Sequence, residues 1–263
     1  MGALSDPERM AAQVASTVTS VSPESRSLTR HGKDRKAELL HHAEVLFAER
    51  GYEDTRMIDI AAAAGVAKGL VYWYFENKET LFQEIVVDLG QRLRRAQGKA
   101  IAGIDDPLER LYVGTAESVR FVAGNHRLYG IISSQLRSDR RLRETRSESQ
   151  RVQAGDAAAL LAEGQERGVV RSDDDPMILA HTNAGVVYYY VLLFAEGRNG
   201  DGPRGLDIEQ AAHGAARYIV RAVGADAQAI ECVLARQAPT RAGTGRRPAS
   251  GSSPRARPAA ASA

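Results

Sequence analysis

The stretch TRMIDIAAAAGVAKGLVYWYF, residues 55–75, decides the fold of this chain. Thr55 is a candidate N-cap for a short apolar helix, which Gly65 ends after about two and a half turns. A second short helix follows over residues 66–75. Gly65 can take the left-handed turn conformation, and the small side chain of Ala61 lets the two helices cross closely. The pattern predicts a helix-turn-helix.

The second of these helices has two different faces. Val71 and Phe75 are four residues apart and are expected to point into the core. The opposite, outward face carries Lys68, Gly69, Tyr72 and Trp73. Exposed aromatic and cationic side chains suit a surface that enters a DNA major groove, where they contact bases and phosphates. The alternative is that the aromatic cluster is packed core and the lysines only solvate a surface.

Outward from this stretch, the chain continues as helix after helix. An amphipathic helix from Arg35 is stopped by Gly51, and Asn77 caps a long helix whose first residue, Lys78, lies where free N–H groups favour a phosphate. Further helices are predicted at about 107–123, 126–136, 140–168, 176–195, 207–223 and 225–234. No stretch alternates with period two, so the fold is predicted to be all-α.

Residues 35–84 resemble the N-terminal domain of the TetR family of transcriptional regulators. The matching elements, in order and without gaps, are Ala43, Leu46, Phe47, Gly51, Tyr52, Thr55, Asp59, Ile60, Ala61, Ala64, Gly65, Val66, Lys68, Gly69, Tyr72, Trp73, Tyr74, Phe75, Asn77, Lys78, Glu79 and Leu81. The resemblance covers about fifty residues. It implies a homodimer with two DNA-reading heads and a small-molecule pocket in each C-terminal domain.

The resemblance also implies which residues contact DNA. The positions that match the family's contacts are Thr55, Arg56, Lys68, Gly69, Tyr72, Trp73, Tyr74 and Lys78. Two of this chain's residues depart from the usual pattern: Ala67 stands where a serine often precedes the lysine, and Arg56 stands where a second threonine often follows. One hydroxyl contact to phosphate is therefore missing, and Arg56 is a candidate to replace it.

The C-terminal part offers two helices for dimerisation. Residues 208–223 carry a broad stripe of mostly small residues, and residues 186–194 form a second apolar helix. Together they could build a two-fold helical bundle. The alternative is that both are ordinary core of a monomer.

Candidates for an effector pocket are aromatic, soft or polar residues on otherwise apolar helices, the mixture that lines small-molecule sites. They are Phe121, Tyr129, Met177, His181 and Tyr188. Each of them, taken alone, is also consistent with a packed core residue.

Composition excludes several classes of protein. The single cysteine, Cys232, cannot form an intramolecular disulfide and favours a reducing, cytoplasmic location. The longest charge-free apolar run, residues 184–195, is short of the roughly 20 residues that span a bilayer, so we expect no membrane span. The first residues have no signal-peptide core.

Three enzyme-like features do not predict an enzyme. Gly200, Gly202 and Gly205 fit a dinucleotide-binding spacing, but no strand precedes them. The neighbours His41 and His42 lack metal-ligand spacing. The acidic run 173–175 before Pro176 is better explained as a helix cap. We therefore expect no catalytic residues, no metal and no cofactor.

The domain organisation follows from these segments. We expect a flexible arm at 1–32, the helix-turn-helix domain at 33–79, a helical ligand-binding and dimerisation domain at 80–235, and a disordered tail at 236–263. The tail holds six arginines and no acid, which leaves the rest of the chain with a formal charge of −4. It either adds attraction to phosphates or is a solvated extension.

The predicted function is a dimeric, ligand-responsive transcriptional regulator. It would bind a palindromic operator through two heads, and an unidentified small molecule would release it from the DNA. Repression is favoured because the resemblance makes it the commoner outcome. The competing hypothesis is a helical ligand-binding or catalytic protein whose helix-turn-helix segment is merely packed.

Overall fold

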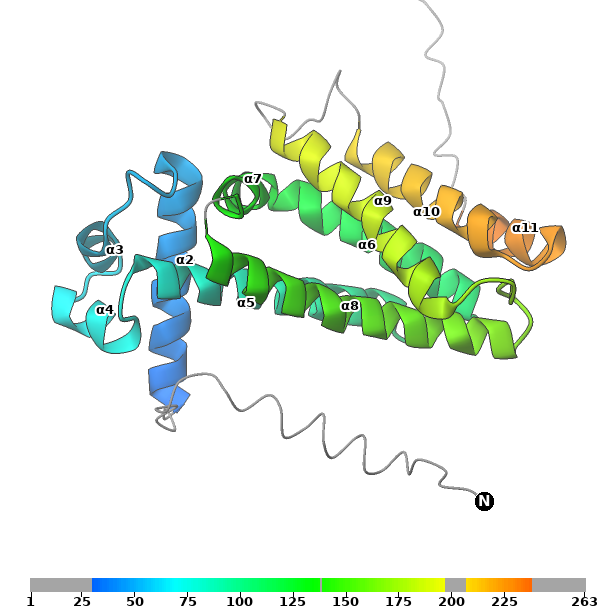
Figure 1. Cartoon of the computed structure of the whole chain (residues 1–263), viewed down its shortest axis with the longest axis horizontal. Coiled ribbons are helices and arrows are strands. Elements are labelled where there is room, and N and C mark those ends of the chain that lie inside the picture. The colour runs from blue at the N-terminus through cyan, green and yellow to red at the C-terminus, as the bar shows by residue number, and fades with distance from the viewer. Residues whose placement is uncertain (1–29, 138, 197–206, 238–263) are drawn as a thin grey trace, which may run out of the picture.

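The computed structural model describes residues 30–137, 139–196 and 207–237 (Figure 1). These residues form α2 (Arg30–Arg50), α3 (Met57–Ala63), α4 (Lys68–Tyr74), α5 (Lys78–Ile101), α6 (Pro107–Gly124), α7 (His126–Gln135), α8 (Arg140–Glu166), α9 (Pro176–Glu196), α10 (Ile208–Val223) and α11 (Ala227–Arg236). Within this part of the chain the only β-type pairing is an isolated bridge between Val170 and Gly224. The all-α prediction is confirmed, with helix ends that differ from the predicted ones by a few residues.

Helices α2, α3 and α4 form a small head at one end of the molecule, and α5 runs from this head into the larger helical domain (Figure 1). Gly51 ends α2 with a φ of 86°, and Gly65 makes the turn between α3 and α4 with a φ of 65°. Both are left-handed conformations that favour glycine. The Asn77 side chain accepts from the Thr80 N–H at 2.7 Å and so caps α5 as the sequence predicted.

The head is held by a small apolar core. Val71 of α4 and Phe75, the residue after its last turn, are fully buried, as their spacing predicted. Phe47 and Phe82 meet edge to face with ring centroids 5.3 Å apart, which joins α2 to α5. Ala61 is 2% exposed where α3 approaches its neighbours, so a larger residue there would not fit without movement.

Helix α6 is the centre of the larger domain. It packs against α5, α8, α9, α10 and α11, and its apolar positions, from Leu108 to Val122, are almost entirely buried. The small-residue stripe of α10 lies against α6 of the same chain: Ala212 and Ala216 are fully buried there. The expectation that this stripe faces a second copy is therefore wrong, because the small residues serve close packing within one subunit.

Helix α9 is the one helix of the described ranges that is long and apolar enough to cross a membrane. Its window Pro176–Phe194 has a mean hydropathy of 1.4, and 22% of the window is buried within this chain. The apolar run identified in the sequence begins only at residue 184, because polar but uncharged residues, among them Asn183, precede it in the helix. One side of α9 packs on α6, α7 and α8, as a helix of a folded domain does.

Three sequence features lie wholly or mostly outside the described residues: the N-terminal arm, the Gly200 to Gly205 run and the C-terminal tail. The first residue assigned to that tail, Arg236, is part of α11. Its guanidinium pairs with Asp106 at 2.6 Å and Glu109 at 3.1 Å, which ties the end of α11 to α6.

Candidate functional site

The outer surface of the head carries most of the residues that the sequence assigned to DNA binding. Tyr72 is 45% and Trp73 is 52% exposed, although both are large aromatic side chains on a short helix. Lys68 and Gly69 are exposed beside them at the start of α4. A Cβ atom added at Gly69 would meet nothing within 4 Å, so this point of the surface is open to close approach.

Contacts among these side chains keep the surface ordered. The Lys68 ammonium lies 5.3 Å from the centre of the Tyr72 ring, a cation–π distance. Trp73 meets Tyr74 edge to face at 4.6 Å, and Tyr74 is half-buried. Aromatic groups with a cation beside them therefore stand outside the core, which leaves them free to contact a partner.

The first short helix adds a second edge to this surface. Arg56 is exposed and occupies the N-cap position, where its N–H donates to Asp59 Oδ2 at 3.0 Å. Ile58 is 53% exposed, although the sequence predicts an apolar helix here. The helix is only seven residues long, about two turns, so the spacing of its apolar residues does not show which of them point inward. The sequence therefore contains no sign that Ile58 lies on the surface.

Thr55 has a different place from the one predicted. Its side chain is fully buried, and its hydroxyl donates to the Gly51 carbonyl at 2.7 Å and approaches the Leu46 carbonyl at 3.4 Å. It is neither the N-cap of α3 nor accessible to a phosphate in this conformation. Thr55 instead fixes the corner between α2 and α3.

Lys78 is also engaged within the head. Its ammonium donates to the Tyr52 carbonyl at 2.7 Å and to the Glu53 carbonyl at 3.3 Å, and it lies 4.2 Å from the centre of the Tyr52 ring. Burial and the neighbouring Glu79 carboxylate raise the pKa of the Tyr52 phenol, so this ring stays neutral at physiological pH. A phosphate contact by Lys78 stays a prediction.

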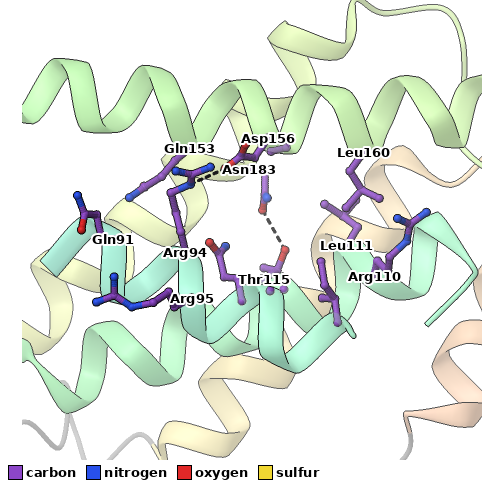
Figure 2. A pocket seen from close by; sticks show the side chains of 15 residues that line it. Gln91, Arg94, Arg95, Arg110, Leu111, Thr115, Gln153, Asp156, Leu160 and Asn183 are labelled. Carbon is purple, nitrogen blue, oxygen red and sulfur yellow. Dashed lines mark hydrogen bonds and ion pairs between the residues drawn. The ribbon is translucent and has the colours of Figure 1, made fainter. Parts of the chain in front are cut away.

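The larger domain contains two neighbouring cavities between α5, α6, α8 and α9, and Tyr129 of α7 also lines the second. The first has a volume of about 610 Å³, and Figure 2 shows Arg94, Arg95 and Arg110 among its lining residues. The second has a volume of about 540 Å³. Both lie in the range of 300–1,000 Å³ that is common for small-molecule sites.

The five pocket candidates divide between cavity and surface. Tyr129, which is 2% exposed, lines the second cavity together with His181 and Tyr188. Phe121 lines neither cavity and packs against the core. Met177 is 42% exposed on α9 and also lies outside both cavities. The described residues contain no cluster of three His, Cys, Asp or Glu side chains that could hold a metal ion.

An ion pair connects the head to the helix that lines the cavities. Arg92 of α5 pairs with Glu44 of α2 at 2.7 Å and with Asp88 at 2.9 Å. Burial raises the pKa of the Glu44 carboxyl, and the adjacent Arg92 opposes that rise. The next residue after Arg92, Leu93, lines the second cavity. A movement of α5 at the cavity would thus displace α2 through this ion pair.

Known proteins resemble this chain in both domains. Residues 39–85 match the family described as "Bacterial regulatory proteins, tetR family". The HTH-type transcriptional repressor KstR2 of Mycobacterium tuberculosis is 31% identical over 146 residues, which cover 54% of this chain and 72% of that protein. The "Probable acrEF/envCD operon repressor" of Escherichia coli K12 is 34% identical over 89 residues, 34% of this chain and only 40% of the relative.

A solved structure extends the similarity of fold beyond the head. A TetR-family transcriptional regulator from a Rhodococcus species superimposes with a TM-score of 0.62 at 19% sequence identity. The alignment covers 71% of this chain and 97% of that chain. The shared architecture is an N-terminal helix-turn-helix domain followed by a helical C-terminal domain.

Proposed function

Since this chain belongs to the TetR family of bacterial regulatory proteins, we propose that it is a dimeric repressor that binds a palindromic operator and is released by a small molecule. It is a DNA-binding transcriptional regulator and not an enzyme. The observation that carries the finer proposal is the exposed face of α4, where Tyr72 and Trp73 stand outside the core beside Lys68.

Different residues of this face contact the bases and the phosphates. Tyr72 and Trp73 pack on thymine methyl groups and sugars, while Lys68 neutralises a phosphate. Gly69 lets the DNA backbone come close because no side chain intervenes. Arg56 adds a charged contact from the start of α3. Thr55 contributes by setting the angle of α3 and not by touching DNA.

A narrow apolar stripe on α9 supports dimerisation. Ile178 is 59%, Tyr189 is 60% and Leu192 is 36% exposed, and at 100° per residue all three lie within a narrow arc of the helix. Gly185 lies on the same arc, with nothing within 4 Å of a Cβ placed there. A contiguous exposed apolar stripe of this kind favours a protein partner. We assign the stripe to the second copy of the chain, together with the 62% exposed Tyr218 of α10.

Effector release needs a path from the cavities to the heads. An effector that prefers one position of α5 shifts α2 through the Arg92 to Glu44 ion pair, and hence the spacing of the two heads. Two heads bind one operator only when their spacing matches successive major grooves. The effector therefore weakens DNA binding to the extent that it prefers another spacing.

Matched lysine variants test the reading head. On the duplex that the full chain selects from random DNA, Lys68→Ala should weaken binding about equally for all sequences and lower the dependence of affinity on salt. Lys99→Ala, an exposed lysine in the last turn of α5, is the control and should change neither quantity. Tyr72→Ala should weaken binding to the selected sequence more than to others. Unchanged affinity in both head variants would exclude this face as the reading head.

A further inference from the structure

The two cavities of the larger domain share part of their walls. Gln97, Gln153, Ala157 and Asn183 line both of them. Two of the three shared polar side chains are hydrogen-bonded: Gln97 donates to Ser118 at 2.9 Å, and Thr115 donates to Asn183 at 3.2 Å (Figure 2 shows the second bond). The cavities are therefore adjacent, with neutral side chains where they meet, and we refer to them as two compartments of one hollow.

The charge of this hollow is strongly one-sided. Its lining contains one carboxylate, Asp156, which pairs with Arg94 at 2.6 Å. Against this single acid stand five arginines, Arg94, Arg95, Arg110, Arg146 and Arg151. Within the described residues, four of these five are ion-paired: Arg94 with Asp156, Arg95 with Asp88 at 3.5 Å, Arg110 with Glu163, and Arg151 with Glu148 at 2.9 Å. What the hollow offers an anion is therefore the guanidinium N–H groups that these pairs leave unused, together with those of Arg146.

Several of these guanidinium groups have unused donor capacity. The Nε of Arg110 is buried and has no hydrogen-bond partner, while its Nη2 pairs with Glu163. Arg146 lies over the Tyr129 ring at 5.6 Å, and no carboxylate of the described residues is within ion-pair distance of it. Guanidinium groups bind carboxylates and phosphates through paired hydrogen bonds.

The second compartment is lined by more apolar side chains than the first. Leu93, Val122, Val187 and Val191 line it, next to the ring of Tyr129. An apolar chain that enters this compartment loses contact with water, which favours binding in proportion to the buried area. Three of the five arginines line the first compartment and two, Arg146 and Arg151, line the second, so the two compartments differ more in their apolar side chains than in their charge.

We propose that the two compartments form one site for an elongated amphiphilic anion. Its carboxylate or phosphate group lies at Arg94, Arg95 and Arg110, and its apolar body passes Ala157 into the second compartment. The inference rests on the proposed function, in which this domain binds the effector, and it adds the effector's chemical class.

Titration calorimetry of the full chain with decanoate tests the class directly. We expect one molecule of decanoate to bind per chain. Its affinity should be at least about tenfold higher than that of 1-decanol or decyltrimethylammonium, because neither of these compounds has the carboxylate that accepts a charged hydrogen bond from an arginine. From hexanoate to octanoate to decanoate, affinity should rise by up to about fourfold per methylene group buried. Decyl phosphate in place of decanoate distinguishes the two head groups, and tight binding of either supports the proposal.

Variants locate the two ends of the ligand. Arg94→Gln combined with Arg95→Gln should weaken decanoate binding about tenfold or more and leave 1-decanol unaffected. The control is Arg167→Gln, which also removes a paired arginine but lies outside both compartments, beside Asp105. Ala157→Leu narrows the junction, so it should reduce the gain from hexanoate to decanoate while hexanoate still binds.

Three results would overturn the proposal: no binding of decanoate or decyl phosphate, equal binding of the alcohol or the cation, or no dependence on chain length. Failure here is distinguishable from failure of the proposed function. A chain that selects one operator from random DNA without ligand, yet binds no anion, refutes only the effector class. A chain that selects no DNA sequence refutes the regulator assignment, whatever the calorimetry shows.

Discussion

At the residue scale, Thr55 holds the corner that orients the reading head. Its buried hydroxyl donates to the Gly51 carbonyl at 2.7 Å. Thr55→Val keeps the shape but leaves that carbonyl without its partner, so the free energy of unfolding should fall by about 1–3 kcal/mol. Urea denaturation measures it. Thr182→Val removes a similar bond to the Ile178 carbonyl at an exposed position and should change stability little. Equal effects of the two changes would contradict the assigned role.

Gly65 is a second residue on which the head depends. Its φ of 65° is a conformation that L residues with a Cβ adopt at a cost. Gly65→Ala should therefore lower the free energy of unfolding by about 1 kcal/mol. Gly155→Ala, in the interior of α8 with open space around it, should raise that free energy by about 0.5–1 kcal/mol. Urea denaturation again measures both, and the same sign in both variants would contradict this account of the turn.

The contrast between Val71 and Thr55 shows what sequence can predict at this scale. Spacing alone placed Val71 and Phe75 inside and Tyr72 and Trp73 outside, because a helix repeats regularly. Thr55 was expected at the N-cap because threonine favours that position, and at the DNA because the family resemblance implies a contact there. Its actual partner, the Gly51 carbonyl, becomes visible only when the path of the chain between α2 and α3 is known.

At the scale of elements, α10 is fastened to α6 by a polar cluster as well as by its small residues. Tyr112 of α6 and the Nδ1 of His213 lie 2.9 Å apart, and Arg120 of α6 pairs with Glu209 of α10 at 2.7 Å. Burial, reinforced by the nearby Arg120 charge, lowers the pKa of His213 below its ordinary value of 6.5. Folding therefore favours the neutral imidazole.

This lowered pKa predicts a pH dependence of stability. The contribution of His213 is present above pH 6.5 and is lost as the pH falls from 6.5 through the lower folded-state pKa, because the unfolded chain binds the proton more readily. His213→Gln should lose less stability than the parent chain when urea denaturation is repeated from neutral pH to below 6.5. His41→Gln, at an exposed position of α2, is the control. A parent-like pH profile for His213→Gln would contradict the assignment.

The link between α2 and α5 gives a prediction about signal transfer. Arg92→Leu removes the ion pair with Glu44 but leaves Leu93 at the cavity. The variant should therefore still bind an effector, but the bound effector should release the operator less effectively. Calorimetry measures the binding, and titration of the operator complex measures the release. Arg140→Leu, whose partner Glu144 is on the same helix and which lines neither cavity, is the control. Undiminished release in Arg92→Leu would place the path elsewhere.

Elements also show where periodicity misleads. The stripe of small residues on α10 was a reasonable dimer face, since small residues allow close helix approach. The same property suits a helix that packs within one chain, and Ala212 and Ala216 are buried against α6. Only the three-dimensional position of α6, which no local pattern encodes, decides between the two.

At the scale of the whole molecule, the exposed stripe of α9 should hold two chains together. A carboxylate placed in an apolar contact costs several kcal/mol, so Ile178→Glu combined with Tyr189→Glu should break the dimer. Sedimentation equilibrium would then give a mass near 28.4 kDa in place of twice that value. The control is Val87→Glu, an equally drastic change at a 38% exposed position of α5, and it should stay dimeric. A variant that stays dimeric with both α9 changes would exclude this face.

The larger domain was less predictable from sequence than the head. Residues 39–85 match a family of regulators, because a helix-turn-helix head must fit the same major-groove geometry whatever the operator sequence. The cavities are lined by residues of five helices, α5 to α9, spread over about a hundred residues of sequence, so their lining could not be found from spacing. Tyr129 was chosen for being aromatic on an apolar helix, but nothing local distinguished it from Phe121, which lines neither cavity.

The measurement that tests the central claim most directly is selection of bound duplexes from random DNA by the full chain at near-physiological salt. We predict enrichment of one inverted repeat whose half-sites lie about one helical turn, or a multiple of it, apart, bound by an even number of chains. Failure of the folded protein to enrich any sequence, or enrichment of a single half-site bound by one chain, would contradict the claim that this is a dimeric operator-binding regulator.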